Sequence, residues 1–260
     1  MKKIRWIQSK LTRRLFATVG WIGAVAVLLV AMGFAGKVEK STICEHISID
    51  IDDSEDRYFV GRQDVLNMFS REGVEIIGKP VSVINLEMLE EILHSHPFID
   101  NAEVYATLSG TLRMEIAQKK PVMRIQSQKL GTFYLDENGE QLPLSKNYSS
   151  RVIVASGHVS KDMLKDLFLL ATFVNKNQFW KSQVQQIYVD WAQEIQLIPR
   201  VGRHKILLGD VSDLDAKFDN LLNFYKHGLN NVGWDKYRVV DLRFKNQVVC
   251  KKYQVKKTSN

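Results

Sequence analysis

The sequence has little cysteine, little proline and no repeated or low-complexity segment. Its 260 residues include two cysteines, five prolines and fifteen glycines. Two cysteines are too few for a disulfide scaffold or a four-cysteine zinc module, and Cys44 and Cys250, far apart in the chain, are expected to stay unpaired. With 45% hydrophobic and 25% charged residues, the composition excludes disordered and collagen-like proteins and supplies one large or two small hydrophobic cores.

Recognisable catalytic patterns are also lacking. The chain contains no phosphate-binding glycine loop, no H-E-x-x-H helix and no G-x-S-x-G turn around Ser156 and His158. His94 and His96 stand at a predicted helix end, where side chains two residues apart point about 200° apart around the axis, and no third ligand accompanies them. We therefore predict that the protein is not an enzyme and holds no cofactor or metal.

Acidic residues are absent from both ends of the chain. The formal net charge is +7, but six basic residues lie within the first fourteen positions and five more follow Phe244, with no acid in either stretch. Residues 37–244 hold the other 25 basic residues against all 29 acids, so the body of the chain is slightly acidic. Nucleic-acid binding needs a basic patch on the fold itself, and we expect no nucleic acid partner.

Charge of either sign is absent from the 22 residues between Leu15 and Gly36. A helix of this length reaches about 33 Å, enough to cross a hydrocarbon core of about 30 Å. The basic residues precede this run, which predicts a cytoplasmic N-terminus and an extracytoplasmic body. The alternative is a cleaved signal peptide with Gly33-Phe34-Ala35 at the cleavage site, but the apolar regions of such peptides span only about 7 to 15 residues. We predict an uncleaved single-pass anchor in the cytoplasmic membrane.

Two small α+β units are predicted after the anchor, because isolated helices alternate with groups of strands. The first has the order strand, helix, helix, strand, strand, at residues 47–51, 61–72, 85–95, 102–108 and 111–118. Asn85 caps its second helix, and Gly73 ends its first. The second unit begins near Pro121 and is rich in strands, at residues 133–135, 152–154, 184–189, 194–198, 205–208, 238–244 and 247–251.

Two helices interrupt the strands of the second unit. One spans residues 161–175 and is capped by Ser160, and the other is capped by Asp213 and ends at Gly228. An Asn138-Gly139 pair predicts a hairpin turn in the same unit.

The last strands of the chain suggest a binding edge. Lysines flank the terminal strand, as they do on edges that are blunted until a partner adds a strand of its own. In the preceding strand, Val240 is expected in the core, whereas Val239 or Arg243 is expected to be accessible at the edge.

The chain resembles the FtsQ/DivIB family of bacterial cell-division proteins. The first unit is similar to that family's POTRA (polypeptide-transport-associated) domain through His96-Pro97-Phe98-Ile99 with Ala102 and Val104, Thr111-Leu112 with Met114 and Ile116, and Lys120-Pro121-Val122. The second is similar to its β domain through Tyr134-Leu135-Asp136 with Gly139, Leu207-Leu208-Gly209 with Lys217 and Leu221, and Val240-Asp241-Leu242-Arg243. Where the family often has an aromatic residue followed by Pro-Asn-Gly, this chain has Phe244-Lys245-Asn246-Gln247.

The resemblance implies a non-enzymatic divisome scaffold that binds FtsB- and FtsL-like membrane proteins at the septum and links early division assembly to septal peptidoglycan synthesis. FtsB would add a strand to the last β-strand, which implies partner binding by Val239, Asp241, Arg243, Val248, Cys250, Lys251 and Tyr253. Other divisome proteins would contact the POTRA-like domain. The implied organisation is a cytoplasmic basic tail (1–14), a transmembrane helix (15–36), a connector (37–46), a POTRA-like domain (47–120), a β domain (121–252) and a flexible tail (253–260). The alternatives are a POTRA-bearing protein-export or outer-membrane assembly module, and an enzyme of the cell envelope.

Overall fold

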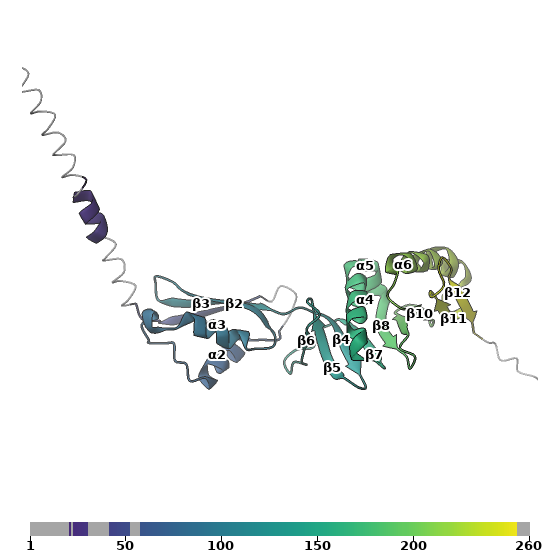
Figure 1. Cartoon of the computed structure of the whole chain (residues 1–260), viewed down its shortest axis with the longest axis horizontal. Coiled ribbons are helices and arrows are strands. Elements are labelled where there is room, and N and C mark those ends of the chain that lie inside the picture. Colours follow the sequence, from purple (N-terminus) through teal and green to yellow (C-terminus); the bar gives the residue numbers. More distant parts are fainter. Residues whose placement is uncertain (1–20, 22, 31–41, 53–57, 254–260) are drawn as a thin grey trace, which may run out of the picture. The chain divides into compact units, whose positions relative to one another are not determined.

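The computed structural model describes Trp21 and residues 23–30, 42–52 and 58–253 (Figure 1). The chain divides into two compact units. Among the described residues, the first takes in Trp21, 23–30, 42–52 and 60–117, and the second takes in 58–59 and 118–253.

The predicted transmembrane segment lies largely outside the described residues. Within the span 15–36, the structure describes Trp21 and residues 23–30, and these residues are helical. Within the described part of the chain, no helix is both long enough and apolar enough to cross a bilayer. The predictions for residues 1–14, 37–41 and 254–260 also fall outside the described part.

The first unit is a three-stranded sheet with two helices, in the predicted order strand, helix, helix, strand, strand. Its elements are β1 (His46–Ile51), α2 (Arg62–Arg71), α3 (Leu86–His94), β2 (Ile99–Ala106) and β3 (Thr111–Gln118), with a short 3-10 turn at Val81–Val83. The strand order is β1-β3-β2, and β1 runs parallel to β3. Alternate residues of β3 are buried, as are the inward faces of both helices, so the core lies between the sheet and the helix pair.

The start of the first unit is more extensive than predicted. Residues 42–45 were expected in the connector, but Cys44 is fully buried, and Ile43 forms a β-bridge with Pro80. The backbone N–H of Cys44 donates to the carbonyl of Lys79 at 2.9 Å, and that of Gly78 donates to the carbonyl of Cys44 at 2.8 Å. These bonds join the entry segment to the loop that precedes α3.

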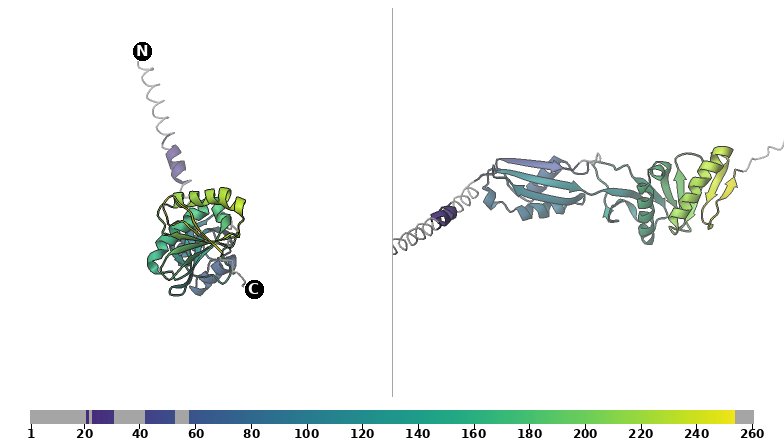
Figure 2. Two further views of the ribbon diagram at one scale, coloured as in Figure 1. Left: turned by 90° about the vertical axis from the view of Figure 1, so that its right-hand side faces the viewer. Right: turned by 90° about the horizontal axis from the view of Figure 1, so that it is seen from above.

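The second unit is a nine-stranded mixed sheet in the order β12-β11-β10-β9-β8-β7-β4-β5-β6 (Figures 1 and 2). Its strands are β4 (Pro121–Ser127), β5 (Gly131–Asp136), β6 (Gln141–Leu142), β7 (Ile153–Gly157), β8 (Val184–Val189), β9 (Ile195–Pro199), β10 (Lys205–Gly209), β11 (Tyr237–Asp241) and β12 (Val249–Lys252). Its helices are α4 (Leu164–Lys176), α5 (Gln178–Gln183) and α6 (Leu214–Asn223), followed by a π-helical turn (Phe224–Leu229) and α7 (Asn230–Val232).

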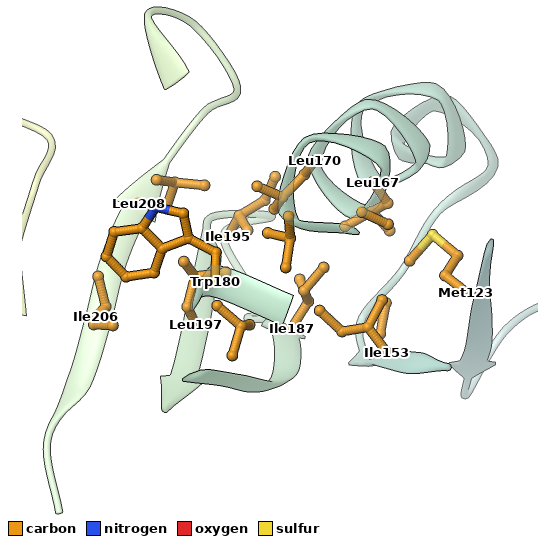
Figure 3. Packing of buried hydrophobic residues seen from close by; sticks show 14 of the residues in the cluster. Met123, Ile153, Leu167, Leu170, Trp180, Ile187, Ile195, Leu197, Ile206 and Leu208 are labelled. Carbon is orange, nitrogen blue, oxygen red and sulfur yellow. The ribbon is translucent and has the colours of Figure 1, made fainter. Parts of the chain in front are cut away.

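The core of the second unit lies between its helices and one face of the sheet (Figure 3). Leu167 and Leu170 of α4 are fully buried against residues of the central strands such as Ile187 and Leu197. Trp180 of α5 lies edge-on to Phe218 of α6, with ring centroids 4.9 Å apart. This contact and that of Phe173 of α4 with Phe218, also at 4.9 Å, connect the two helical groups that cover the sheet.

One predicted helix end is wrong, and two predicted caps make no side-chain hydrogen bond. The helix after Asp213 does not end at Gly228 but continues through the π-helical turn and α7 to Gly233, which has φ 93°. Gly228 lies inside the turn and packs against the ring of Phe224, where a Cβ would lie only 2.7 Å from a ring carbon. Asn85 does cap α3, accepting from the Met88 N–H at 3.1 Å, whereas the side chains of Ser160 and Asp213 make no capping hydrogen bond.

The end of β7 requires glycine. Gly157 has φ 97°, and a Cβ there would lie 2.2 Å from the carbonyl oxygen of Val189 on β8. Gly131 has a similar φ of 81° with open space around its Cα. A side chain at either position would therefore strain a left-handed backbone, but only at Gly157 would it also clash with main-chain atoms.

We expect Gly157→Ala to lower the free energy of unfolding of the second unit by at least about 3 kcal/mol, against about 1–2 kcal/mol for Gly131→Ala. Urea unfolding followed by tryptophan fluorescence measures both, since Trp180, Trp191 and Trp234 lie in this unit. Equal losses for the two variants would contradict the proposed clash.

Candidate partner-binding edge

The terminal strand β12 forms one edge of the large sheet. It pairs with β11 alone among the described strands, antiparallel, with Val240 opposite Cys250 and Asp241 opposite Val249. The opposite edge is formed by β6, which has only two residues. An added strand can form a longer ladder on β12, which has four residues.

The backbone direction of β11 follows from its contact with β10. Leu242, which follows β11, donates its N–H to the carbonyl of Leu207 on β10 at 2.9 Å. Successive residues of a strand direct their N–H and C=O groups to opposite sides, so Val240 also faces β10, and Val239 and Asp241 face β12.

The same alternation determines which groups of β12 are available. Val249 and Lys251 lie opposite Asp241 and Val239, so their backbone groups point inward, toward β11. Cys250 lies between them, so its N–H and C=O groups point away from the sheet, whereas the register of the ladder shifts before Lys252. Continued one residue before β12, this alternation also turns the N–H of Val248 outward.

The side chains of the predicted site divide into buried and accessible groups. Val240 is fully buried, as predicted. Of the two residues expected to be accessible, Arg243 is exposed and Val239 is not, because the side chain of Val239 is only 4% exposed. Asp241 is also buried, at 2% exposed. Val239 lies on an inner strand with Lys205 and Lys251 directly opposite on either side, and the aliphatic stems of such neighbours flank a small side chain.

Arg243 is exposed to solvent, but its guanidinium is hydrogen-bonded to two carboxylates. Its guanidinium donates to Asp241 at 2.7 and 2.9 Å and to Glu194 at 2.8 and 2.9 Å. Hydrogen bonds from Arg243 lower the pKa of Asp241, and the two carboxylates raise that of Arg243. Arg243 thereby ties the loop after β11 to the start of β9.

The remaining predicted residues lie along the exposed margin of the sheet. Val248 and Cys250 are half-buried and pack against the core, whereas Lys251 is exposed. Burial raises the pKa of the Cys250 thiol. Tyr253 is 41% exposed, and its hydroxyl donates to the carbonyl of Arg203 at 2.8 Å, which fastens the chain just after β12.

A cavity of ≈ 580 Å³ lies beside this edge, between the loop after β11, the start of α6 and the start of β9. On its wall, Lys217 pairs with Asp210 at 2.7 Å, and hydrogen bonds from Lys217 and Ser212 lower the pKa of Asp210 to about 2. Glu194 and Asp210 were absent from the predicted site. The seven-residue spacing of Asp210 and Lys217 could have indicated their ion pair from the sequence. No local sequence pattern connects Glu194 with Arg243, which lies 49 residues away.

The other sequence candidates have local roles. The hydroxyl of Ser156 accepts from Gln186 at 2.6 Å, and the ring of His158 stacks on Trp191 with centroids 3.5 Å apart. Burial lowers the pKa of His96. Across the described part of the chain, no group of three or more His, Cys, Asp or Glu side chains is placed to hold a metal ion. Cys44 and Cys250 are both free.

Both units match known domain families. The POTRA-like domain model matches residues 42–117, and the model described as FtsQ/DivIB, C-terminal related, matches residues 120–251. The chain belongs to the FtsQ/DivIB cell-division family. The cell division protein FtsQ of Geotalea daltonii (strain DSM 22248 / JCM 15807 / FRC-32) is 26% identical over 204 residues, which cover 74% of this chain and 70% of that protein.

Replacing Arg243 by Lys should raise the pKa of Asp241 toward its ordinary value of about 3.9, because one ammonium cannot reproduce the paired guanidinium bonds. The pKa of Asp241 is depressed in the folded state, so its contribution is present above pH ~4 and is lost at lower pH. We expect Arg243→Lys to lower the free energy of unfolding at neutral pH by about 1 kcal/mol, a value kept small because Arg243 is partly exposed to solvent.

Carboxyl titration by NMR measures this change, and Asp210 serves as the internal control because Lys217 and Ser212 hold it independently. An unchanged Asp241 titration in the Arg243→Lys variant would contradict the assigned pairing.

Proposed function

We propose that this protein is a non-enzymatic, single-pass membrane scaffold of the bacterial divisome. Membership of the FtsQ/DivIB family supports a role in cell division. The uncharged run from Leu15 to Gly36, preceded by six basic residues, supports an anchor with a cytoplasmic N-terminus and two extracytoplasmic units. The protein would act at the septum of the inner membrane.

Its main partners would be FtsB- and FtsL-like membrane proteins. An extended segment of the FtsB-like partner would add to β12 as a tenth strand. The single observation that carries this proposal is that β12 is a sheet edge whose Cys250 directs its backbone groups outward. Through this contact the protein would link early division assembly to septal peptidoglycan synthesis.

The side chains of the site would contribute in different ways. Val248, Cys250, Lys251 and Tyr253 line the edge and would touch the added strand. Arg243 would position the loop after β11 for contact with the partner, and Asp241 fixes Arg243 by accepting two hydrogen bonds from its guanidinium. Val239 is buried, so its contribution would be to keep β11 in register with β12.

Replacing Val248 by Pro tests the strand-addition proposal. The substitution removes an outward N–H, so we expect partner affinity to fall about tenfold or more while stability changes by less than about 0.5 kcal/mol. Val248→Thr keeps the N–H and a similar shape, and should bind normally. Val249→Pro removes an inward N–H and should lower the free energy of unfolding by about 1–3 kcal/mol.

The measurement is co-purification of the full chain from detergent with an FtsB-like partner, alongside urea unfolding of each variant. Partner capture by the Val248→Pro variant at the level of the unmodified protein would mean that the partner does not pair with β12.

Depletion in the producing cell tests the biological role. The division scaffold predicts filamentous cells that lack septa and retain their outer-membrane proteins. Normal division with loss of outer-membrane proteins would instead support an assembly or export module. Mass spectrometry of the detergent-solubilised protein should identify small coiled-coil membrane proteins among its companions.

A further inference from the structure

Four exposed aliphatic side chains gather at one end of the first unit. They are Ile43, Ile77, Val83 and Leu108, with exposed fractions of 50%, 57%, 70% and 90%. We refer to these four residues as the apolar end. They come from the entry segment, the connection between α2 and α3, and the turn between β2 and β3, and the neighbours Cys44 and Ile76 of two of them are buried.

Backbone contacts bring these loops together. The N–H of Val81, which begins the turn containing Val83, donates to the carbonyl of Thr42 at 2.9 Å. The N–H of Gly78, next to Ile77, donates to the carbonyl of Cys44 at 2.8 Å. The entry segment 42–45 is therefore the common neighbour of both loops.

The turn between β2 and β3 meets the same segment. Glu45 donates its N–H to the carbonyl of Gly110 at 3.2 Å, and a Cβ at Gly110 would lie 2.5 Å from the carbonyl oxygen of Ile43. Within the turn, Thr107 donates its N–H to the carbonyl of Thr111 at 2.9 Å. Leu108 thus projects into solvent from a tightly bonded turn, which presents it at little further cost in conformational entropy.

The chain enters the first unit at this end. Gly36, the last residue of the uncharged run, precedes Thr42 by six residues, which span at most about 22 Å when fully extended. If residues 15–36 are anchored in a bilayer, the apolar end is held within that distance of its surface. Tethering of this kind raises the effective concentration of lipid at the apolar end, so even a weak contact is populated.

We propose that the apolar end of the first unit rests on the extracytoplasmic surface of the bilayer, with Leu108 entering the headgroup region. This inference rests on the proposed function, because it requires the anchor. Aliphatic side chains standing apart on several loops suit the boundary between headgroups and acyl chains. The turn from Thr107 to Gly110 carries no charge, and Glu75 pairs with Lys79 at 3.6 Å, so the contact is apolar and should be insensitive to salt.

Lipid-phase quenching tests the proposal on the full chain in vesicles of phosphatidylethanolamine and phosphatidylglycerol. A polarity-sensitive fluorophore is attached through Leu108→Cys, in a Cys250→Ser background, and Cys44 stays unlabelled because it is fully buried. The matched control carries the fluorophore through Asp100→Cys, on an exposed residue eight positions earlier on the same hairpin and about 26 Å away along the strand.

Quenching by lipids with spin-labelled acyl chains should be about threefold stronger at position 108 than at position 100, at low and high salt alike. Equal quenching at the two positions overturns the proposal. An emission shift at position 108 without lipid quenching also overturns it, because a protein would then cover this end.

A second pair of variants guards against effects of the label at position 108. The fluorophore is attached through Ser109→Cys, with and without Leu108→Asp, and quenching should fall several-fold when Leu108 is replaced. Unchanged quenching means that Leu108 does not enter the lipid. Extraction at alkaline pH distinguishes failure of the proposed anchor from failure of the proposed lipid contact. A chain that is released from the vesicles lacks the anchor. A chain that is retained but whose label at position 108 is not quenched refutes only the lipid contact.

Discussion

The second unit depends on an aromatic cluster centred on Trp180 of α5 and Phe218 of α6. Trp180 is 4% exposed and Phe218 is 1% exposed, and Phe173 and Tyr225 extend the same cluster to α4 and to the π-helical turn. This cluster joins the helices over the centre of the sheet to those over its last strands. Because α6 is fixed in this way, the buried side chains of β10 and β11 can pack against it. β11 in turn provides the hydrogen-bonding partner of β12.

The two ends of that sheet are built differently. At one end the sheet finishes with a strand of two residues, too short to serve as a template. At the other, β12 is longer and carries Lys251 and Lys252 in an exposed position. Lysines at an edge discourage unspecific pairing while leaving the backbone groups available to a strand that compensates their charge. Arg243 and Tyr253 hold the chain on both sides of β12, so the edge is presented in a defined register.

Much of this fold was predictable from periodicity, and the failures have physical causes. The strand at Val184–Val189 and the order of elements in the first unit follow directly from alternating or helical hydrophobic patterns. The π-helical turn was not predictable, because a glycine such as Gly228 usually marks a helix end, and here it lies inside the turn beside the ring of Phe224. The burial of Val239 was equally hidden: it depends on Lys205 and Lys251 as strand neighbours, and sequence gives no register for strands 34 and 12 residues away. The pairing of Arg243 with Glu194 joins loops that meet only after the sheet has formed.

The exposed position of β12 has a consequence for the lifetime of the protein. A four-residue strand bonded on one side opens at a lower free energy than the interior strands, and opened termini are where proteases start. A partner strand that binds only the closed form would reduce the open population in proportion to its own concentration. The amount of this protein in the cell would then follow the amount of its partner, so that surplus, unassembled copies are removed without a dedicated regulator.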